Sequence, residues 1–142
     1  MQNVHYSFFA FLLCFSILIP GCEQDPGEGG RATITGSVIW RDTYSSPILN
    51  IEDSVIAEYP AVEERIYLTY GSEGVYDDDF RTDFDGKYEF KFLRKGVYKL
   101  FAYHKCEDCD EGLEPVFVEV EISKNKGDNA APTIYLINDT SN

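Results

Sequence analysis

The chain has 142 residues, a formal net charge of −13, ten Tyr and ten Phe. This length suits one domain, and hydrophobic residues make up 44% of the chain, which is enough for a packed core. Residues 1–21 contain no Asp, Glu, Lys or Arg, so the negative charge falls on the remainder. Proteins bind nucleic acid largely through Lys and Arg that displace counterions, so this composition argues against a nucleic-acid partner.

The first residues have the pattern of an export signal. Residues 6–20 form an uncharged apolar run that is shorter than the roughly twenty residues of a membrane span. The run ends in Leu18-Ile19-Pro20-Gly21-Cys22, which resembles the lipobox of bacterial lipoproteins. The resemblance implies a signal peptide at 1–21 and acylation of Cys22 with palmitate-like chains, which would anchor the protein to a membrane.

Residues 23–30 read EQDPGEGG and offer no large apolar side chain for burial. We therefore expect a flexible acidic tether at 22–30, a folded domain at 31–138 and a disordered tail at 139–142. The acids after Cys22 resemble the signals that direct some lipoproteins outward. They favour the outer membrane of the cell envelope, with exposure at the cell surface.

Alternating apolar and polar residues predict strands at 31–42 and 64–70. Trp40 falls on the apolar face of the first strand and is expected in the core. Residues 43–62 contain two prolines and alternate poorly, so they are interpreted as an irregular crossing connection with a short edge strand at 54–57. Residues 71–79 are expected to form a loop, followed by a short strand.

The stretch 82–104 predicts two antiparallel strands joined as a β-hairpin. Tyr88, Phe90 and Phe92 alternate with charged residues and are expected on the buried face. After them, residues 94–96 provide a turn, and the alternation then resumes.

The last third of the domain predicts an acidic loop at 105–112, a strand at 114–124, a turn at 125–129 and a final strand at 133–137. Together with the regular spacing of turns and the absence of a helical period, these elements predict an all-β fold. We expect an antiparallel β-sandwich of seven or eight strands.

Several of these segments together resemble the carboxypeptidase regulatory-like domains, which are transthyretin-like and related to Cna-B modules. The resemblance rests on these segments: Ile34-Thr35-Gly36-Ser37-Val38, Arg65-Ile66-Tyr67-Leu68, residues 82–90, Leu93, Gly96-Val97-Tyr98 and Leu100. It implies a transthyretin-like sandwich and a non-catalytic stalk, spacer or binding module.

Cys106 and Cys109 are the two thiols that an exported, acylated chain would retain, and we expect a disulfide between them. Together with His104 they could alternatively bind Zn²⁺ or copper, or act as a redox pair, although the acidic neighbours would raise the thiol pKa values. Asp110 stands where a c-type haem motif requires histidine.

Acidic turns suggest a second hypothesis, a Ca²⁺ site. Asp83 and Asp85 precede one strand, and Asp108 and Asp110 lie two strands later, so the two turns should lie at the same end of a sandwich. The alternative is that these side chains hydrogen-bond their own backbone, as Asp in turns usually does.

Several aromatic side chains fall on strand faces opposite the expected core. Phe101 and Tyr103 lead this set, which also contains Tyr67, Phe117 and Tyr135. They would form an aromatic patch suited to sugar rings or to a protein partner. The alternatives are an error in strand phase or coverage of the patch by residues 43–62.

Outside the leader, the sequence contains no recognised catalytic motif. His104 is the single histidine there, and neither a GxSxG motif nor a phosphate-binding loop occurs. The sequence therefore predicts a lipid-anchored envelope protein without catalytic activity that binds an envelope protein or a glycan. The alternative is a metal-binding or thiol-redox lipoprotein centred on His104, Cys106 and Cys109.

Overall fold

A computed structural model describes residues 25–71, 75–106, 109 and 111–141. In these residues the fold is all-β. The nine strands are β1 (Glu28–Ser46), β2 (Ile51–Pro60), β3 (Arg65–Tyr70), β4 (Asp78–Arg81), β5 (Lys87–Leu93), β6 (Gly96–Lys105), β7 (Leu113–Ile122), β8 (Lys126–Ala130) and β9 (Ile134–Asp139).

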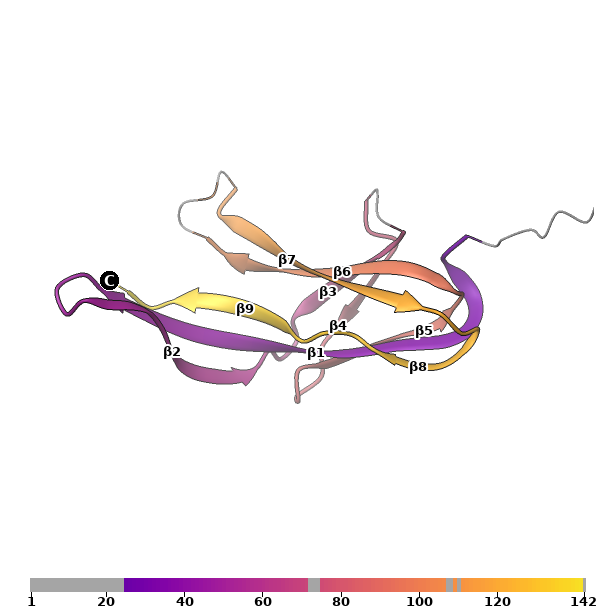
Figure 1. The fold of residues 1–142 in the computed structure, drawn as a ribbon, viewed down its shortest axis with the longest axis horizontal. Helices are drawn as coiled ribbons and strands as arrows, with labels where there is room; N and C mark the ends of the chain where they lie inside the picture. Colours follow the sequence, from indigo (N-terminus) through magenta and orange to yellow (C-terminus); the bar gives the residue numbers. More distant parts are fainter. Residues whose placement is uncertain (1–24, 72–74, 107–108, 110, 142) are drawn as a thin grey trace, which may run out of the picture.

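The long strand β1 organises the first sheet and runs the length of the molecule (Figure 1). Its first half lies between β5, which is antiparallel to it, and β8, which is parallel. Its second half lies between β2, also antiparallel, and β9, also parallel. One strand therefore holds together four partners, three of which lie far from it in sequence.

The second sheet has the order β4-β3-β6-β7, and all of its pairs are antiparallel. The two sheets pack face to face, so the predicted β-sandwich is confirmed. The described residues contain nine strands instead of seven or eight, and the parallel pairs of β8 and β9 with β1 add to the antiparallel pattern.

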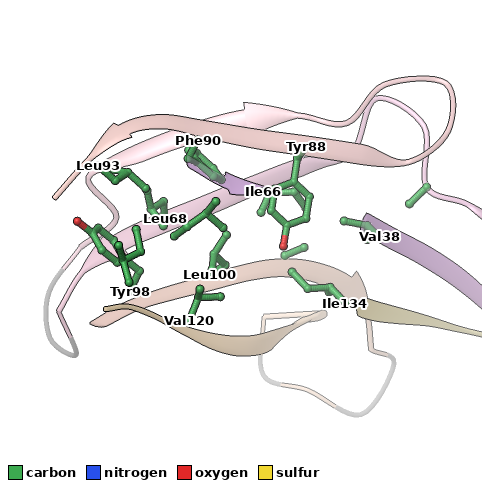
Figure 2. Close-up of a cluster of buried hydrophobic side chains, with 14 of the residues drawn as sticks. Val38, Ile66, Leu68, Tyr88, Phe90, Leu93, Tyr98, Leu100, Val120 and Ile134 are labelled. Carbon is green, nitrogen blue, oxygen red and sulfur yellow. The ribbon is translucent and has the colours of Figure 1, made fainter. Parts of the chain in front are cut away.

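The core lies between the sheets, where Leu93 and Phe90 of β5 face Tyr98, Leu100 and their neighbours (Figure 2). These side chains are almost fully buried, as the alternation of apolar residues predicts. Trp40, expected in the core, is half-buried and packs against its margin.

The hairpin predicted for residues 82–104 is wrong. β5 pairs with β1 in the first sheet, whereas β6 pairs with β3 and β7 in the second. The turn at Arg94 and Lys95 therefore carries the chain across the sandwich. Each of the two strands needs one buried face. They obtain it equally well whether they face each other across the core or pair side by side in one sheet.

Phe92 was expected on the buried face of its strand, but it is 68% exposed, and Leu93 is buried instead. The β1–β5 register shifts at this point, and Phe92 adopts a positive φ of 61°. Such a β-bulge adds one residue to the strand and reverses the direction of the side chains after it.

Residues 43–62 do not cross the molecule as an irregular connection. β1 continues to Ser46 and returns as β2, so this segment is a long hairpin of the first sheet. From Ser54 to Pro60 the side chains of β2 are all exposed, and a strand without a buried face has no reason to alternate. The expected turn at 125–129 is likewise mostly strand, because β8 is a polar strand paired with β1.

Both ends of the domain extend beyond the expected boundaries of 31 and 138. The Gly27 N–H donates to the Tyr98 hydroxyl at 3.0 Å, and β1 begins at Glu28, so part of the expected tether is built into the sandwich. At the other end, Thr140 and Ser141 hydrogen-bond to β1 instead of forming a disordered tail. The described residues include no helix of the length and apolarity that crossing a membrane requires.

Candidate binding site

A cluster of aromatic rings covers part of the outer face of the four-stranded sheet. Leu100 and Ala102 of β6 are buried in the core, so Phe101 and Tyr103 between and after them point outward. The cluster, which we call the aromatic face, consists of Tyr67, Tyr76, Phe101, Tyr103 and Phe117.

The strand register aligns three of these rings in one row across the sheet. Tyr67 of β3 is opposite Phe101 of β6, which is opposite Phe117 of β7. The ring centroids are 5.0 Å apart in the first pair and 5.3 Å apart in the second. Tyr76 and Tyr103 widen the row, with centroids 4.7 and 5.8 Å from that of Tyr67. All these separations lie within the range of about 4.5–7 Å that favours aromatic pairs.

The members of the aromatic face differ in their exposure to solvent. Phe101, in the middle of the row, is only 9% exposed because its neighbours enclose it. Phe117 is 52% exposed, Tyr76 47% and Tyr103 38%. A ligand would therefore meet these three rings, while Phe101 supports Tyr103 and Phe117, and Tyr67 supports Tyr76.

Charged side chains border the aromatic face. Arg65 Nη1 donates to both carboxylate oxygens of Asp79, at 3.0 and 2.9 Å, and Asp79 is opposite Tyr67 in the β3–β4 pair. At the next register position, Lys99 Nζ lies 5.5 Å from the centroid of the Phe117 ring, and Lys99 is opposite Glu119. Apolar rings and hydrogen-bonding groups thus occupy one continuous surface.

The two alternative explanations of the exposed aromatics do not hold. The strands are correctly phased, since their other faces form the core, and residues 43–60 belong to the opposite sheet. Of the predicted set, only Tyr135 lies elsewhere. It belongs to β9, and the Arg41 guanidinium covers its ring at 3.4 Å from the centroid.

Tyr76 is the member that the sequence did not reveal. It precedes β4 in a segment with no alternation, so no periodic signal marks the direction of its side chain. Its location follows from the pairing of β4 with β3, which brings the preceding residues next to Tyr67.

Cys106 and Cys109 form the predicted disulfide in the β6–β7 loop. Next to it, His104 Nδ1 lies 3.0 Å from the Ile137 carbonyl oxygen. Because a carbonyl only accepts, Nδ1 carries the proton and donates this bond from the second sheet to the first. Nε2 lies 3.5 Å from a carboxylate oxygen of Glu114. The described contacts of His104 therefore join the two sheets.

The structure describes only two of the four residues in the calcium hypothesis, Asp83 and Asp85. Asp108 and Asp110 lie outside the described residues, as do the leader and Cys22. One carboxylate oxygen of Asp83 accepts from the backbone N–H groups of Asp85 and Lys87, at 2.9 and 2.8 Å. This is the turn-stabilising role that the sequence offered as the alternative, and the calcium site stays a prediction.

Comparison with known proteins gives little further information. No family model and no curated protein matches the chain. Among solved structures, the chain is similar to a crystal structure from Pseudomonas aeruginosa described as a "putative carbohydrate binding protein". The identity is 14%, the TM-score is 0.43, and the match covers 79% of this chain and 91% of the other. A likeness at this level carries no argument about function, and the chain is defined by its fold as an all-β sandwich protein.

Proposed function

We propose that this protein is a lipid-anchored, non-catalytic module of the cell envelope that binds glycans through the aromatic face. The observation that supports the binding role is the set of three exposed rings, Tyr76, Tyr103 and Phe117, held in place by Tyr67 and Phe101. Large exposed apolar patches with a polar border typically mark interaction surfaces.

The chemistry of the aromatic face suits sugars. The C–H groups on one face of a pyranose pack against the electron-rich face of an aromatic ring, while its hydroxyls hydrogen-bond to polar groups at the border. Arg65, Asp79 and Glu119 lie at suitable register positions for that second role. The net charge of −13 disfavours acidic polysaccharides, so the proposed ligands are uncharged glycans.

Of the alternative functions, a bound metal at His104, Cys106 and Cys109 receives less support, whereas a disulfide is also the oxidised form of a thiol-redox pair. Metal ligation by cysteine uses the thiolate, and the sulfur atoms of Cys106 and Cys109 are bonded to each other. His104 is occupied by the Ile137 carbonyl and faces Glu114. These contacts engage the atoms that the metal hypothesis assigns to ligation.

Binding to a panel of uncharged polysaccharides, by pull-down and by glycan array, tests the proposed ligand class. The double variant Tyr103→Ala/Phe117→Ala should lose most of its binding and stay folded with a modestly lower melting temperature, because both rings are partly solvent-exposed. Phe84→Ala is the matched control, since Phe84 is 87% exposed in the turn before β5, and this turn hydrogen-bonds to Val38 of the opposite sheet. Equal binding by all three proteins would refute the proposal.

The proposed anchor has a separate test. Mass spectrometry of the protein purified from membranes should show a chain that begins at Cys22 and carries acyl groups. A chain with an unmodified cysteine would refute the anchor and leave the glycan proposal standing.

A further inference from the structure

Five cationic side chains gather at the end of the sandwich where the described chain begins. The two turns at this end follow β5 and β7, and the described chain begins at the opposite end of the molecule from the C-terminus (Figure 1). Strand pairing brings the turns together, because Gly96 is opposite Ile122 and Arg31 is opposite Lys126. The basic end, as we call this surface, consists of Arg31, Arg94, Lys95, Lys124 and Lys126.

These five cations differ from most of the others in the protein. In the part of the chain that the structure describes, none of the five has an ion-pair partner, whereas Arg41, Arg65, Lys87 and Lys91 are all paired with acids. In a chain with 25 acidic and 12 basic residues, unpaired cations at one end are not expected from composition alone. Their charge is available to an anionic partner.

Three of the five line a cleft of about 920 Å³ between the first described residues and the two turns. Arg31, Arg94 and Lys95 contribute positive charge to this cleft, and Asp25 and Glu121 contribute negative charge. Lys124 and Lys126 flank Asn125 at its rim and increase the excess of positive charge. Glu28, which precedes the lining Gly29, is a third acid at this end, so five cations exceed three acids and the local charge is opposite in sign to that of the whole protein.

We propose that the basic end rests on the anionic phospholipid headgroups of the membrane and holds the sandwich upright. This inference depends on the anchor at Cys22, which lies only three residues before the first described residue and would bring this end to the lipid surface. Phosphate groups of the lipids are the complementary charges, and Lys and Arg near an anionic bilayer are attracted to it.

The shape of the molecule makes the remaining negative charge compatible with this orientation. β1 has 19 residues, so it extends over about 60 Å at the usual rise of a strand. Electrostatic interactions in physiological salt are screened beyond about 8 Å. The acids toward the far end therefore do not oppose the contact, and they disfavour the molecule lying flat.

Fluorescence quenching by labelled headgroups tests the orientation. The acylated full-length chain is reconstituted into phosphatidylcholine vesicles with or without phosphatidylglycerol, carrying a dye on Asn125→Cys or, at the opposite end, on Asn50→Cys. We expect quenching at position 125 only in the anionic vesicles, decreasing with salt, and none at position 50. The proposal would be overturned if position 125 showed no quenching, or if its quenching did not depend on the charge of the lipid.

Charge reversal supplies the matched control. Lys95→Glu/Lys124→Glu and Lys87→Glu/Lys105→Glu change the net charge equally, and all four side chains are exposed. The first pair should reduce quenching at position 125 by about threefold or more, and the second pair should leave it unchanged. Equal loss in both would mean that net charge acts without the basic end.

Two further arms separate neighbouring explanations. Inorganic phosphate should reduce quenching no more than sodium chloride of equal ionic strength; a stronger effect would indicate a site for free phosphate and overturn the lipid assignment. If Cys22 proves unmodified, the upright orientation is overturned; the full chain should then still co-sediment with anionic vesicles more than with neutral ones, and equal sedimentation would overturn the lipid contact of the basic end as well. Glycan binding is measured independently, so the failure of either proposal can be recognised separately.

Discussion

Tyr88 and Gly36 lie opposite each other in the β1–β5 pair, and the Tyr88 ring occupies the space that a side chain at position 36 would fill. The Tyr88 hydroxyl is buried and has no hydrogen-bond partner among the described residues. Figure 2 shows this oxygen pointing into the interior of the sandwich. Burial raises the pKa of Tyr88, so the hydroxyl is neutral at any physiological pH.

Tyr88→Phe should therefore stabilise the protein by about 1 kcal/mol, because it removes a buried polar group that makes no hydrogen bond. Urea denaturation of both proteins measures the difference. Gly36→Ala should be strongly destabilising, because its Cβ would overlap the Tyr88 hydroxyl and ring. A destabilised Tyr88→Phe variant would show that the hydroxyl has a partner in solution.

Tyr98 connects the first described residues to the core. Its hydroxyl accepts from the Gly27 N–H at 3.0 Å and donates to the Arg94 carbonyl at 2.9 Å. Tyr98→Phe should lower the free energy of unfolding by about 1–3 kcal/mol, because it leaves the buried Gly27 N–H unsatisfied. Hydrogen exchange at residues 27–30 should accelerate more than exchange in β7. Unchanged exchange at these residues would contradict the role given to Tyr98.

Alkaline pH should destabilise the fold through tyrosines. Burial and, to a smaller extent, Glu28 raise the pKa of Tyr70 from 10.0 to about 12, and burial also raises the pKa of Tyr98. Below pH 10 the phenols are protonated in both folded and unfolded chains, so stability is constant. Between pH 10 and about 12 only the unfolded chain releases these protons, so the free energy of unfolding falls.

Thermal denaturation between about pH 8 and about pH 11.5 measures this fall in the free energy of unfolding, and Tyr70→Phe should make the fall shallower. Tyr67→Phe is the control, because Tyr67 lies on the outer aromatic face and not in the core. An equal slope in Tyr70→Phe and in the unmodified protein would contradict the assignment.

The disulfide should have a modest effect on stability. Cys106 and Cys109 are three residues apart, and closing so short a ring removes at most about 2 kcal/mol of unfolded-chain entropy. Cys106→Ser/Cys109→Ser should unfold at slightly lower urea concentration and bind glycans unchanged. Loss of glycan binding in this variant would place the loop in the binding site.

Alternation in the sequence predicted which side chains are buried better than it predicted which strands pair. Tyr98 and Leu100 are in the core as expected, yet β5 and β6 lie in opposite sheets. Alternation shows only that one face of a strand is buried. It does not show whether the next strand along the chain lies beside it in the same sheet or faces it across the core. The pairing of β5 with β1 depends on contacts such as Tyr88 over Gly36, which lie far apart in sequence.

Elements without a buried face left little signal, and the edge strand expected at 54–57 covers only part of β2. β2 is exposed along most of its length, and β8 has the polar sequence KGDNA, so neither alternates. For the candidate site, the outward direction of Phe101, Tyr103 and Phe117 followed from alternation. The contact of Tyr76 and the burial of Phe101 did not, because both arise from neighbours on other strands.

The burial of Phe101 yields its own prediction. Phe101→Ala should destabilise the protein by about 3 kcal/mol, because its ring is enclosed by the rings of Tyr67, Tyr103 and Phe117. Phe117→Ala should cost far less, since Phe117 is half-exposed. Thermal melts of the two variants distinguish a supporting ring from a ligand-facing one, and equal losses would contradict this division.

The central claim, that the aromatic face binds uncharged glycans, is tested most directly by an NMR titration that resolves individual aromatic rings. On addition of a glycan identified by pull-down, the ring signals of Tyr76, Tyr103 and Phe117 should shift together and saturate, while those of Phe84 and Phe92 stay constant. Saturable shifts at Phe84, Phe92 or the cysteine loop, with none on the aromatic face, would contradict it.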